Sequence, residues 1–407
     1  MSPAGIGASV LRREDLRLLT GHGRYSDNRN AAGQAYAAFV RSPHAHADIA
    51  SIDVAAAKSM PGVVGVFTAR DLLADGLSPV PTLLAERSGG ITNRDGTPFA
   101  EPPWFALAID RARFVGEAVA MVVAETPFAA QDAAEAVRVD YRVRDAVVDM
   151  LRADDPDVAQ IHDSAPRNRA YDWECGDPQA TARAIATAAH VAKVHLIDNR
   201  LIICFMEPRS ALATWDAARE RYTLFAGLNS THQHAGNLAR VFGVPLDRIR
   251  CVTDDVGGGF GARNQMYPEY IAITWAARHL NRPVKWTGTR SEAFLTDSQS
   301  RDHVLDGELA LDPTGRITGL RVHSTTNLGA HFAPTIPYST LSNMERMVSS
   351  LYAIPAIHLH IEGRFTNTVP LNVFRGVGRF ECVYTMERLI EVAARETGRD
   401  PHSAVYR

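Results

Sequence analysis

The chain lacks several features that mark large classes of proteins. It has only four cysteines in 407 residues, and no two of them form a C-x-x-C pair. Zinc knuckles and iron–sulfur clusters need clustered cysteines, so the sequence predicts neither kind of site. Widely spaced cysteines are typical of a reducing compartment, and we therefore expect a cytoplasmic location.

Long apolar runs and a basic excess are absent as well. No apolar segment reaches the length of a bilayer, so we expect no membrane span. Lys and Arg total 43 against 46 Asp and Glu, and a formal net charge of −3 gives no sign of a nucleic-acid partner. With 46% hydrophobic residues, the composition is that of a globular protein with two or three cores. A small-molecule ligand is the expected partner.

Local patterns divide the chain into two blocks. Residues 1–148 form the first block and residues 171–407 the second, with a linker over 149–170 that is rich in Asp, Pro and Ala. In the first block we expect strands over 35–40 and 115–124 and a helix over 127–137. In the second block the periodicity predicts helices over 231–242, 267–280 and 388–395 and a strand over 249–253.

A glycine-rich turn over residues 254–263 (DDVGGGFGAR) lies between a predicted strand and a predicted helix. Glycine has no Cβ, so main-chain N–H groups in such a turn can approach a ligand closely, and φ can become positive without strain. A helix that started directly after the turn would add a second attraction for negative charge. The turn is therefore predicted to bind an anionic group.

The turn also matches the dinucleotide-binding pattern G-x-G-x-x-A over residues 257–262. That pattern requires an acidic residue about 20 positions later to hold a ribose hydroxyl. Arg278, His279, Asn281 and Arg282 occupy that neighbourhood instead. A Rossmann-type NAD(P)- or FAD-dependent oxidoreductase is therefore only a distant alternative.

Several separated segments share a second pattern. They cover residues 13–15, 18–21, 23–27, 41–47, 114–120, 206–209, the glycine turn and 374–379. In sequence and in order these segments resemble the molybdopterin-binding large subunits of the xanthine dehydrogenase, aldehyde oxidase and carbon monoxide dehydrogenase family, the molybdenum hydroxylases. The resemblance covers essentially the whole chain.

The resemblance implies a fold and a chemistry. The fold is α+β, with an N-terminal α/β hammerhead domain followed by the first of two molybdenum-cofactor-binding α/β domains, which hold the cofactor between them. The implied cofactor is molybdenum–molybdopterin cytosine dinucleotide, which hydroxylates a substrate carbon with oxygen taken from water. Electrons would pass to an iron–sulfur subunit and to an FAD-binding subunit.

The same resemblance assigns two cofactor-binding segments. The first comprises Gly258, Gly259, Phe260 and Gly261, whose backbone would approach the pterin. The second comprises Phe374, Arg375 and Gly376, in which the planar guanidinium of the arginine would face an anionic oxygen. No residue of this chain is assigned a catalytic or metal-ligating role.

Departures from the family pattern limit the range of expected substrates. Asn229 stands where the family usually has a glutamine that donates to an oxo group of the cofactor. Arg263 and Asn264 stand where some members have a lysine and a substrate-orienting glutamate, so purine recognition is not expected. Gly376 stands where carbon monoxide dehydrogenases carry a copper-binding cysteine, so oxidation of carbon monoxide is not expected. An aldehyde or an N-heterocycle remains.

The resemblance also leads us to expect a truncated chain. The family's second cofactor domain is missing after the predicted helix over 388–395, and with it the late glutamate that acts as general base. Two interpretations stay open. Either another chain supplies the second domain to an active oxidoreductase, or the polypeptide is a non-catalytic remnant, which we favour for the chain in isolation.

Three histidine pairs and Glu117 carry alternative, structural interpretations. The first pair follows Pro43 and is expected in a structural loop, and the second starts a helix and is expected to be solvated or near the helix cap. The third pair shares a strand face without an evident third metal ligand, and Glu117 is expected to be a buried carboxylate with a partner. The pairs are His44 with His46, His232 with His234, and His358 with His360.

Overall fold

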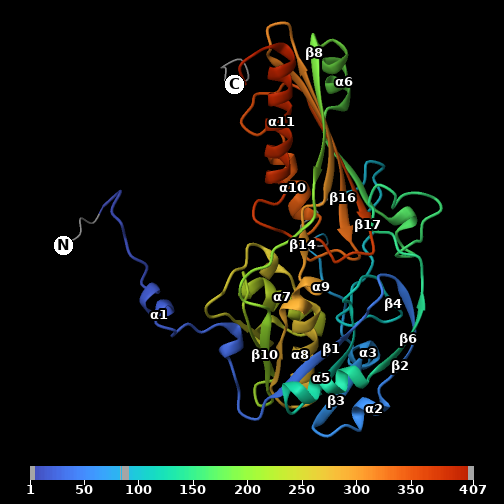
Figure 1. The fold of residues 1–407 in the computed structure, drawn as a ribbon, viewed down its shortest axis with the longest axis vertical. Coiled ribbons are helices and arrows are strands. Elements are labelled where there is room, and N and C mark those ends of the chain that lie inside the picture. Colours follow the sequence, from blue (N-terminus) through green and yellow to red (C-terminus); the bar gives the residue numbers. More distant parts are fainter. Residues whose placement is uncertain (1–4, 83, 85–90, 402–407) are drawn as a thin grey trace.

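The computed structural model describes residues 5–82, 84 and 91–401, which form an elongated molecule with two lobes (Figure 1). A seven-stranded mixed sheet is the centre of one lobe and a five-stranded sheet the centre of the other. The expected α+β class is confirmed by the fold and by its likeness to solved structures. Among the described residues, no helix combines the length and the apolar character that crossing a bilayer requires.

The seven-stranded sheet joins segments from the first third of the chain to segments from its middle. β1 pairs in parallel with β13 and antiparallel with β5, which places N-terminal strands beside strands near residue 285. In spatial order the strands are β12 (Ile249–Val252), β11 (Arg221–Ala226), β10 (Ser210–Asp216), β13 (Val284–Thr287), β1 (Ala35–Arg41), β5 (Ala118–Ala124) and β3 (Val63–Thr68).

The five-stranded sheet is the backbone of the other lobe. Its strands are, in spatial order, β7 (Arg169–Gly176), β17 (Ile357–Phe365), β16 (Ile317–Gly329), β15 (His303–Leu311) and β8 (His190–Asp198). Two smaller sheets complete the β-structure: β4 (Arg111–Ala112), β2 (Ala47–Asp53) and β6 (Arg138–Val143), and the pair β14 (Gln299–Ser300) with β9 (Leu201–Ile202).

The longer helices cover these sheets and bury two large apolar cores. On the seven-stranded sheet, α5 lies against β1 and β5, α8 against β10 and β13, and α7 against β12, whereas α11 and α6 lie on the five-stranded sheet. The helices are α1 (Asp15–Leu19), α2 (Ala55–Lys58), α3 (Ala69–Ala74), α5 (Pro127–Ala136), α6 (Pro178–Ala186), α7 (Thr231–Phe242), α8 (Pro268–His279), α9 (Arg290–Thr296), α10 (Tyr338–Met347) and α11 (Arg379–Thr397).

Most elements expected from the sequence are present. The helix α7 has the predicted bounds because Ser230 caps its first turn and Gly243 ends it in the left-handed conformation. Thr126 likewise caps α5 by accepting a hydrogen bond from the backbone of Ala129. Two predicted bounds were wrong. β5 starts at Ala118 rather than residue 115, because Gly116 turns the chain at φ 98°, and α11 is much longer than the segment 388–395.

The segment over residues 149–170 is irregular, as expected of a linker, but it is packed. Ile161 is completely buried in the core under the five-stranded sheet, and His162 is 4% exposed. The seven-stranded sheet also contains strands from both sides of the segment. The domain limits at residues 148 and 171 stay a prediction.

Candidate functional site

The two segments that the sequence singles out lie together in the structure. The backbone N–H of Arg375 donates to the carbonyl of Phe260, with 2.8 Å between nitrogen and oxygen. Gly261 lies against the same loop, since a Cβ placed on it would be 2.5 Å from the carbonyl oxygen of Val373. Segments more than a hundred residues apart therefore form one continuous surface of backbone.

The glycine turn needs its glycines for conformation and for space. Gly258 and Gly261 have φ values of 105° and 109°, which L side chains rarely adopt, and Phe260 between them has φ 51°. A Cβ on Gly258 would lie 2.8 Å from the Cβ of Phe205. One side of the turn is thus closely packed against the protein. The other side faces solvent, and Phe260 is 50% exposed there.

Backbone donors are the chemically distinctive feature of this surface. In the described part of the chain, the N–H groups of Gly258, Gly259, Phe260 and Gly261 donate to no acceptor, and neither do those of Phe374 and Gly376. Such groups cost free energy when they are left without a partner away from water. A run of free N–H groups around residues with positive φ favours the binding of anions.

We expected the start of a helix directly after the glycine turn to attract negative charge, and this expectation was wrong. A short 3₁₀ turn over Ala262–Asn264 follows it, and α8 begins only at Pro268. The second loop instead leads straight into a long helix, because Gly378 is the N-cap of the 19-residue α11. The positive end of a helix dipole thus lies at the second loop rather than at the first. The late helix start also removes the geometry of a Rossmann turn.

A buried arginine holds the glycine turn from inside. Arg263 is completely buried, and its guanidinium donates to the carbonyls of Gly258 at 2.6 Å and Glu207 at 2.8 Å. It also lies 3.0 Å from the carboxylate of Glu207, which accepts a hydrogen bond from the backbone N–H of Gly257 at 2.8 Å. The sequence singled out Arg263 as a departure at a substrate position, whereas in the structure it supports the turn.

A second buried arginine, which no sequence pattern predicted, holds the other loop. Arg301, 4% exposed, donates to the carbonyl of Arg375 at 2.8 Å and pairs with Glu381 on α11 at 3.2 Å. Its guanidinium lies over the rings of Phe374 and Phe380. The φ of Arg301 is 67°, which is unusual for a residue other than glycine, but this angle is known only from the structure.

Two aspartates at the start of the turn are neutralised by the N-terminal segment. Arg17 makes a two-bond pair with Asp255 at 2.5 and 2.6 Å, and Arg29 makes one with Asp254. The pair with Arg17 lowers the pKa of Asp255 to about 2. The backbone N–H and hydroxyl of Ser26 reach across to Glu207. These contacts cancel negative charge that would otherwise repel an anion at the turn.

Asn229 lies over the glycine turn from the start of α7. Its backbone N–H donates to the carbonyl of Arg263 at 3.1 Å, and a Cβ on Gly259 would be 2.9 Å from its side-chain oxygen. The side chain of Arg375 is exposed and makes no ion pair or hydrogen bond with the described residues. Both polar groups are thus available at the edge of the free N–H groups.

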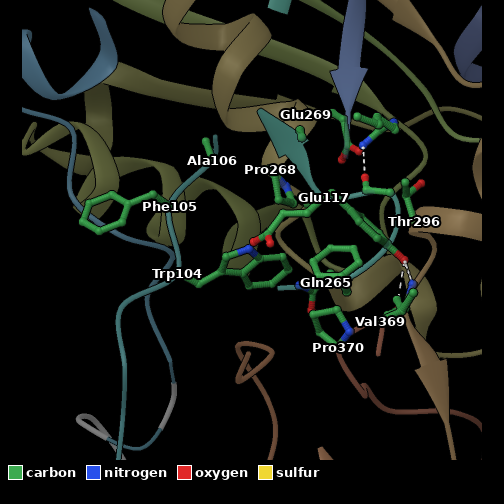
Figure 2. Close-up of a pocket in the computed structure, with 16 residues that line it drawn as sticks. Trp104, Phe105, Ala106, Glu117, Gln265, Pro268, Glu269, Thr296, Val369 and Pro370 are labelled. Carbon is green, nitrogen blue, oxygen red and sulfur yellow. Dashed lines mark hydrogen bonds and ion pairs between the residues drawn. The ribbon is translucent and has the colours of Figure 1, made fainter. Parts of the chain in front are cut away.

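An enclosed cavity lies beside the loops at the junction of the two sequence blocks (Figure 2). Its volume is about 20 Å³, which is room for about one water molecule. Trp104 and Glu117 line it from the first block, and Gln265 and Val369 from the second. Both polar atoms of the Gln265 side chain are buried without a partner among the described residues. The cavity suits a bound water and is too small for a substrate.

The structural interpretations of Glu117 and the histidines meet mixed outcomes. Glu117 is buried and 2.7 Å from His331, as expected of a paired carboxylate. His46 is buried and bonded to the carbonyl of Asp145 at 2.7 Å, consistent with a structural loop. His234 was expected to be solvated or near the helix cap, and the second alternative holds: it is fully buried, and its ring lies between the carbonyl of the N-cap residue Ser230 and that of Gln265.

Comparison with known proteins identifies the family. The profile of the molybdopterin cofactor-binding domain matches residues 161–407, and that of the aldehyde oxidase and xanthine dehydrogenase a/b hammerhead domain matches residues 20–145. The chain belongs to the molybdenum hydroxylase family. The resemblance predicted from the sequence is confirmed.

Individual molybdenum hydroxylases match this chain along nearly its whole length. The carbon monoxide dehydrogenase large chain of Hydrogenophaga pseudoflava is 32% identical over 98% of this chain and 49% of its own length. The nicotine 6-hydroxylase large subunit of Paenarthrobacter nicotinovorans is 33% identical over 97% of this chain and 47% of its own. The chain therefore spans about half the length of the curated relatives it matches.

Solved structures of molybdenum hydroxylases share the fold. Quinoline 2-oxidoreductase from Pseudomonas putida 86 superposes with a TM-score of 0.87 at 32% identity, over 97% of this chain and 48% of the other. Carbon monoxide dehydrogenase from Oligotropha carboxidovorans gives a TM-score of 0.88 at 31% identity, over 98% and 49%. The hammerhead and cofactor-binding architecture expected from the sequence is confirmed.

Proposed function

We propose that this chain forms one wall of a molybdenum–molybdopterin cytosine dinucleotide site in a hydroxylase of an aldehyde or an N-heterocycle. The observation that carries the proposal is the run of free backbone N–H groups on the two loops. An anionic pterin cofactor would satisfy these donors. The fit is chemical, because free N–H donors around residues with positive φ suit a group that carries negative charge.

The residues of this chain would act by binding and orienting. Gly258, Gly259, Phe260 and Gly261 would offer N–H groups to the pterin, while the second loop, over residues 374–376, would approach from the start of α11. Bound cofactor supplies the oxidising power and the activated oxygen for hydroxylation of a carbon. The protein side holds donors in fixed positions, which stabilises developing negative charge without reorganisation.

The substrate class is supported by what the second loop lacks and by the names of the relatives. Gly376 has no side chain that binds copper, and its φ of 91° disfavours a cysteine there. Relatives at 32–33% identity are named for nicotine and quinoline, which are N-heterocycles. We therefore favour an N-heterocycle within the proposed substrate classes.

The proposed partners follow from the same family. An iron–sulfur subunit and an FAD-binding subunit would take the electrons. All four cysteines are free, which supports a cytoplasmic location. The alternative function, a non-catalytic remnant, predicts a folded chain that binds neither cofactor nor partners.

The test is expression of the chain together with the genes that flank its own, in a host that makes the cytosine dinucleotide cofactor. After affinity purification, molybdenum is measured by mass spectrometry and cytidine monophosphate after acid hydrolysis. Equal, near-stoichiometric amounts of both, with oxidation of quinoline or benzaldehyde by an artificial electron acceptor, would support the proposal. Absence of both metal and nucleotide would overturn the proposal.

A further inference from the structure

Three neighbouring strands of the five-stranded sheet gather histidines and carboxylates on one face, away from the loops described above. His360 and Glu362 are two residues apart on β17, so they point to the same side. The register places His323 of β16 opposite His360, and Asp172 of β7 opposite Glu362. The sequence identified His360 as a possible ligand without a third partner, because the partners come from β7 and β16.

The potential ligand atoms of this group are close together. Nε2 of His360 is 2.6 Å from Oδ1 of Asp172, and Nε2 of His323 is 3.3 Å from Oε2 of Glu362. One ligand atom each from Asp172, His360 and Glu362 lie within 4.8 Å of one another. The two imidazole rings are stacked, with centroids 4.7 Å apart and an angle of 20° between the planes.

We propose a binding site for one divalent transition-metal ion, with Zn²⁺ as the reference case, formed by His360, Asp172 and Glu362. One imidazole nitrogen and two carboxylate oxygens are donors that Zn²⁺ accepts, and a water molecule would complete a tetrahedral set. His323 lies at the edge of this group, 3.3 Å from Glu362. The ion would tie β7, an edge strand, to the inner strand β17.

Surrounding groups prepare the donors for this role. Arg94 binds both oxygens of Asp172, at 2.8 and 2.9 Å, and Arg364 donates to Oε1 of Glu362 at 3.0 Å, which leaves Oε2 toward the histidines. Such outer partners orient ligating carboxylates.

The group is also accessible. Asp172 and Arg94 line an open cleft of about 730 Å³, and the side chains of Asp172, His360 and Glu362 are each 15–18% exposed. A metal ion can therefore enter from solvent without unfolding the sheet. The group therefore has an entry path from solvent as well as suitable ligand atoms, and a metal site requires both.

The test is isothermal titration of the full chain with Zn²⁺ after removal of metals with EDTA. A Cys204→Ser background removes the exposed free thiol as a competing zinc ligand. We expect one ion per chain, and an affinity at least about tenfold weaker in Glu362→Gln and in His360→Ala. Glu362→Gln keeps the shape of the side chain, so it carries the test if His360→Ala does not fold.

A matched control lies on the same sheet. Nε2 of His190 on β8 is 2.8 Å from Glu396, and this pair belongs to no group of three potential ligands among the described residues. His190→Ala should therefore leave zinc affinity unchanged. Zinc should also raise the thermal unfolding temperature of the parent and not of Glu362→Gln. The proposal is overturned if zinc binding is absent, or is equal in the parent and in Glu362→Gln.

Discussion

The guanidinium of Arg263 lies 3.0 Å from the carboxylate of Glu207 beneath the glycine turn, and Arg263 is completely buried. Replacement of Arg263 by Met would leave Glu207 without its cation and the carbonyl of Gly258 without its donor. A broken buried pair costs about 3–5 kcal/mol. We expect a loss of this size in the free energy of unfolding, measured by urea denaturation.

The control for this prediction is an arginine of the surface. Arg219 pairs with Asp216, but its side chain is 71% exposed. Arg219→Met should cost less than about 1 kcal/mol, because exposed ion pairs contribute little. Equal losses in the two variants would show that Arg263 does not hold the turn.

Two glycines of the turn should respond differently to alanine. In Gly261→Ala the new Cβ meets a backbone oxygen, that of Val373, at 2.5 Å, and φ is 109°. We expect a loss of at least about 1–3 kcal/mol and faster proteolysis at the second loop. In Gly259→Ala the Cβ meets the side chain of Asn229 at a backbone angle that alanine tolerates, so the loss should be smaller. The reverse order would contradict the described packing of the two loops.

Acid should destabilise the protein from near neutral pH because of a buried histidine. Burial lowers the pKa of His162 from 6.5 to about 2. Below pH 6.5 the unfolded chain therefore binds a proton that the folded chain does not. Stability is fully present above pH 6.5 and should fall by about 1.4 kcal/mol per pH unit below it, for this group alone.

The measurement is the free energy of unfolding of the parent and of His162→Gln between pH 7.5 and 5.0. The variant should lose less stability on acidification, by about 1.4 kcal/mol for each pH unit below 6.5. Asp198 opposes this effect, since burial raises its pKa to about 6, but it does so equally in both proteins. Parallel pH profiles would contradict a neutral, buried His162.

The two leucines of α1 should contribute little to the stability of the chain alone. Leu16 and Leu19 are 75% and 86% exposed, and α1 buries no residue, although its Arg17 pairs with Asp255 of the glycine turn. Leu16→Ser with Leu19→Ser should change the free energy of unfolding by no more than about 0.5 kcal/mol. It should also reduce self-association in sedimentation velocity, since exposed apolar side chains promote association. A large destabilisation would show that these two side chains pack against the body in solution.

Local signals predicted local structure, and tertiary contacts supplied the rest. The helix α7 was predictable because its cap and its terminating glycine are adjacent to it in sequence. The support of the two loops was not, because Arg301 reaches the carbonyl of Arg375, and Glu207 reaches Ser26, over long separations in sequence. The burial of His234 was not predictable for the same reason, since the carbonyl of Gln265 that covers it comes from another segment.

The parallel pairing of β1 with β13 has a consequence for synthesis of the chain. Ala35 pairs with Val284 in this ladder, so about 250 residues are translated after β1 before its neighbour β13 is available. At roughly 5–20 residues per second, translation of these residues takes some tens of seconds. During this time β1 lies at an unpaired edge of the partial sheet that β1, β5 and β3 form. Long-range parallel pairs form slowly and expose strand edges to aggregation. A lower growth temperature or co-expression of chaperones should therefore raise the yield of folded protein more than a stronger promoter does.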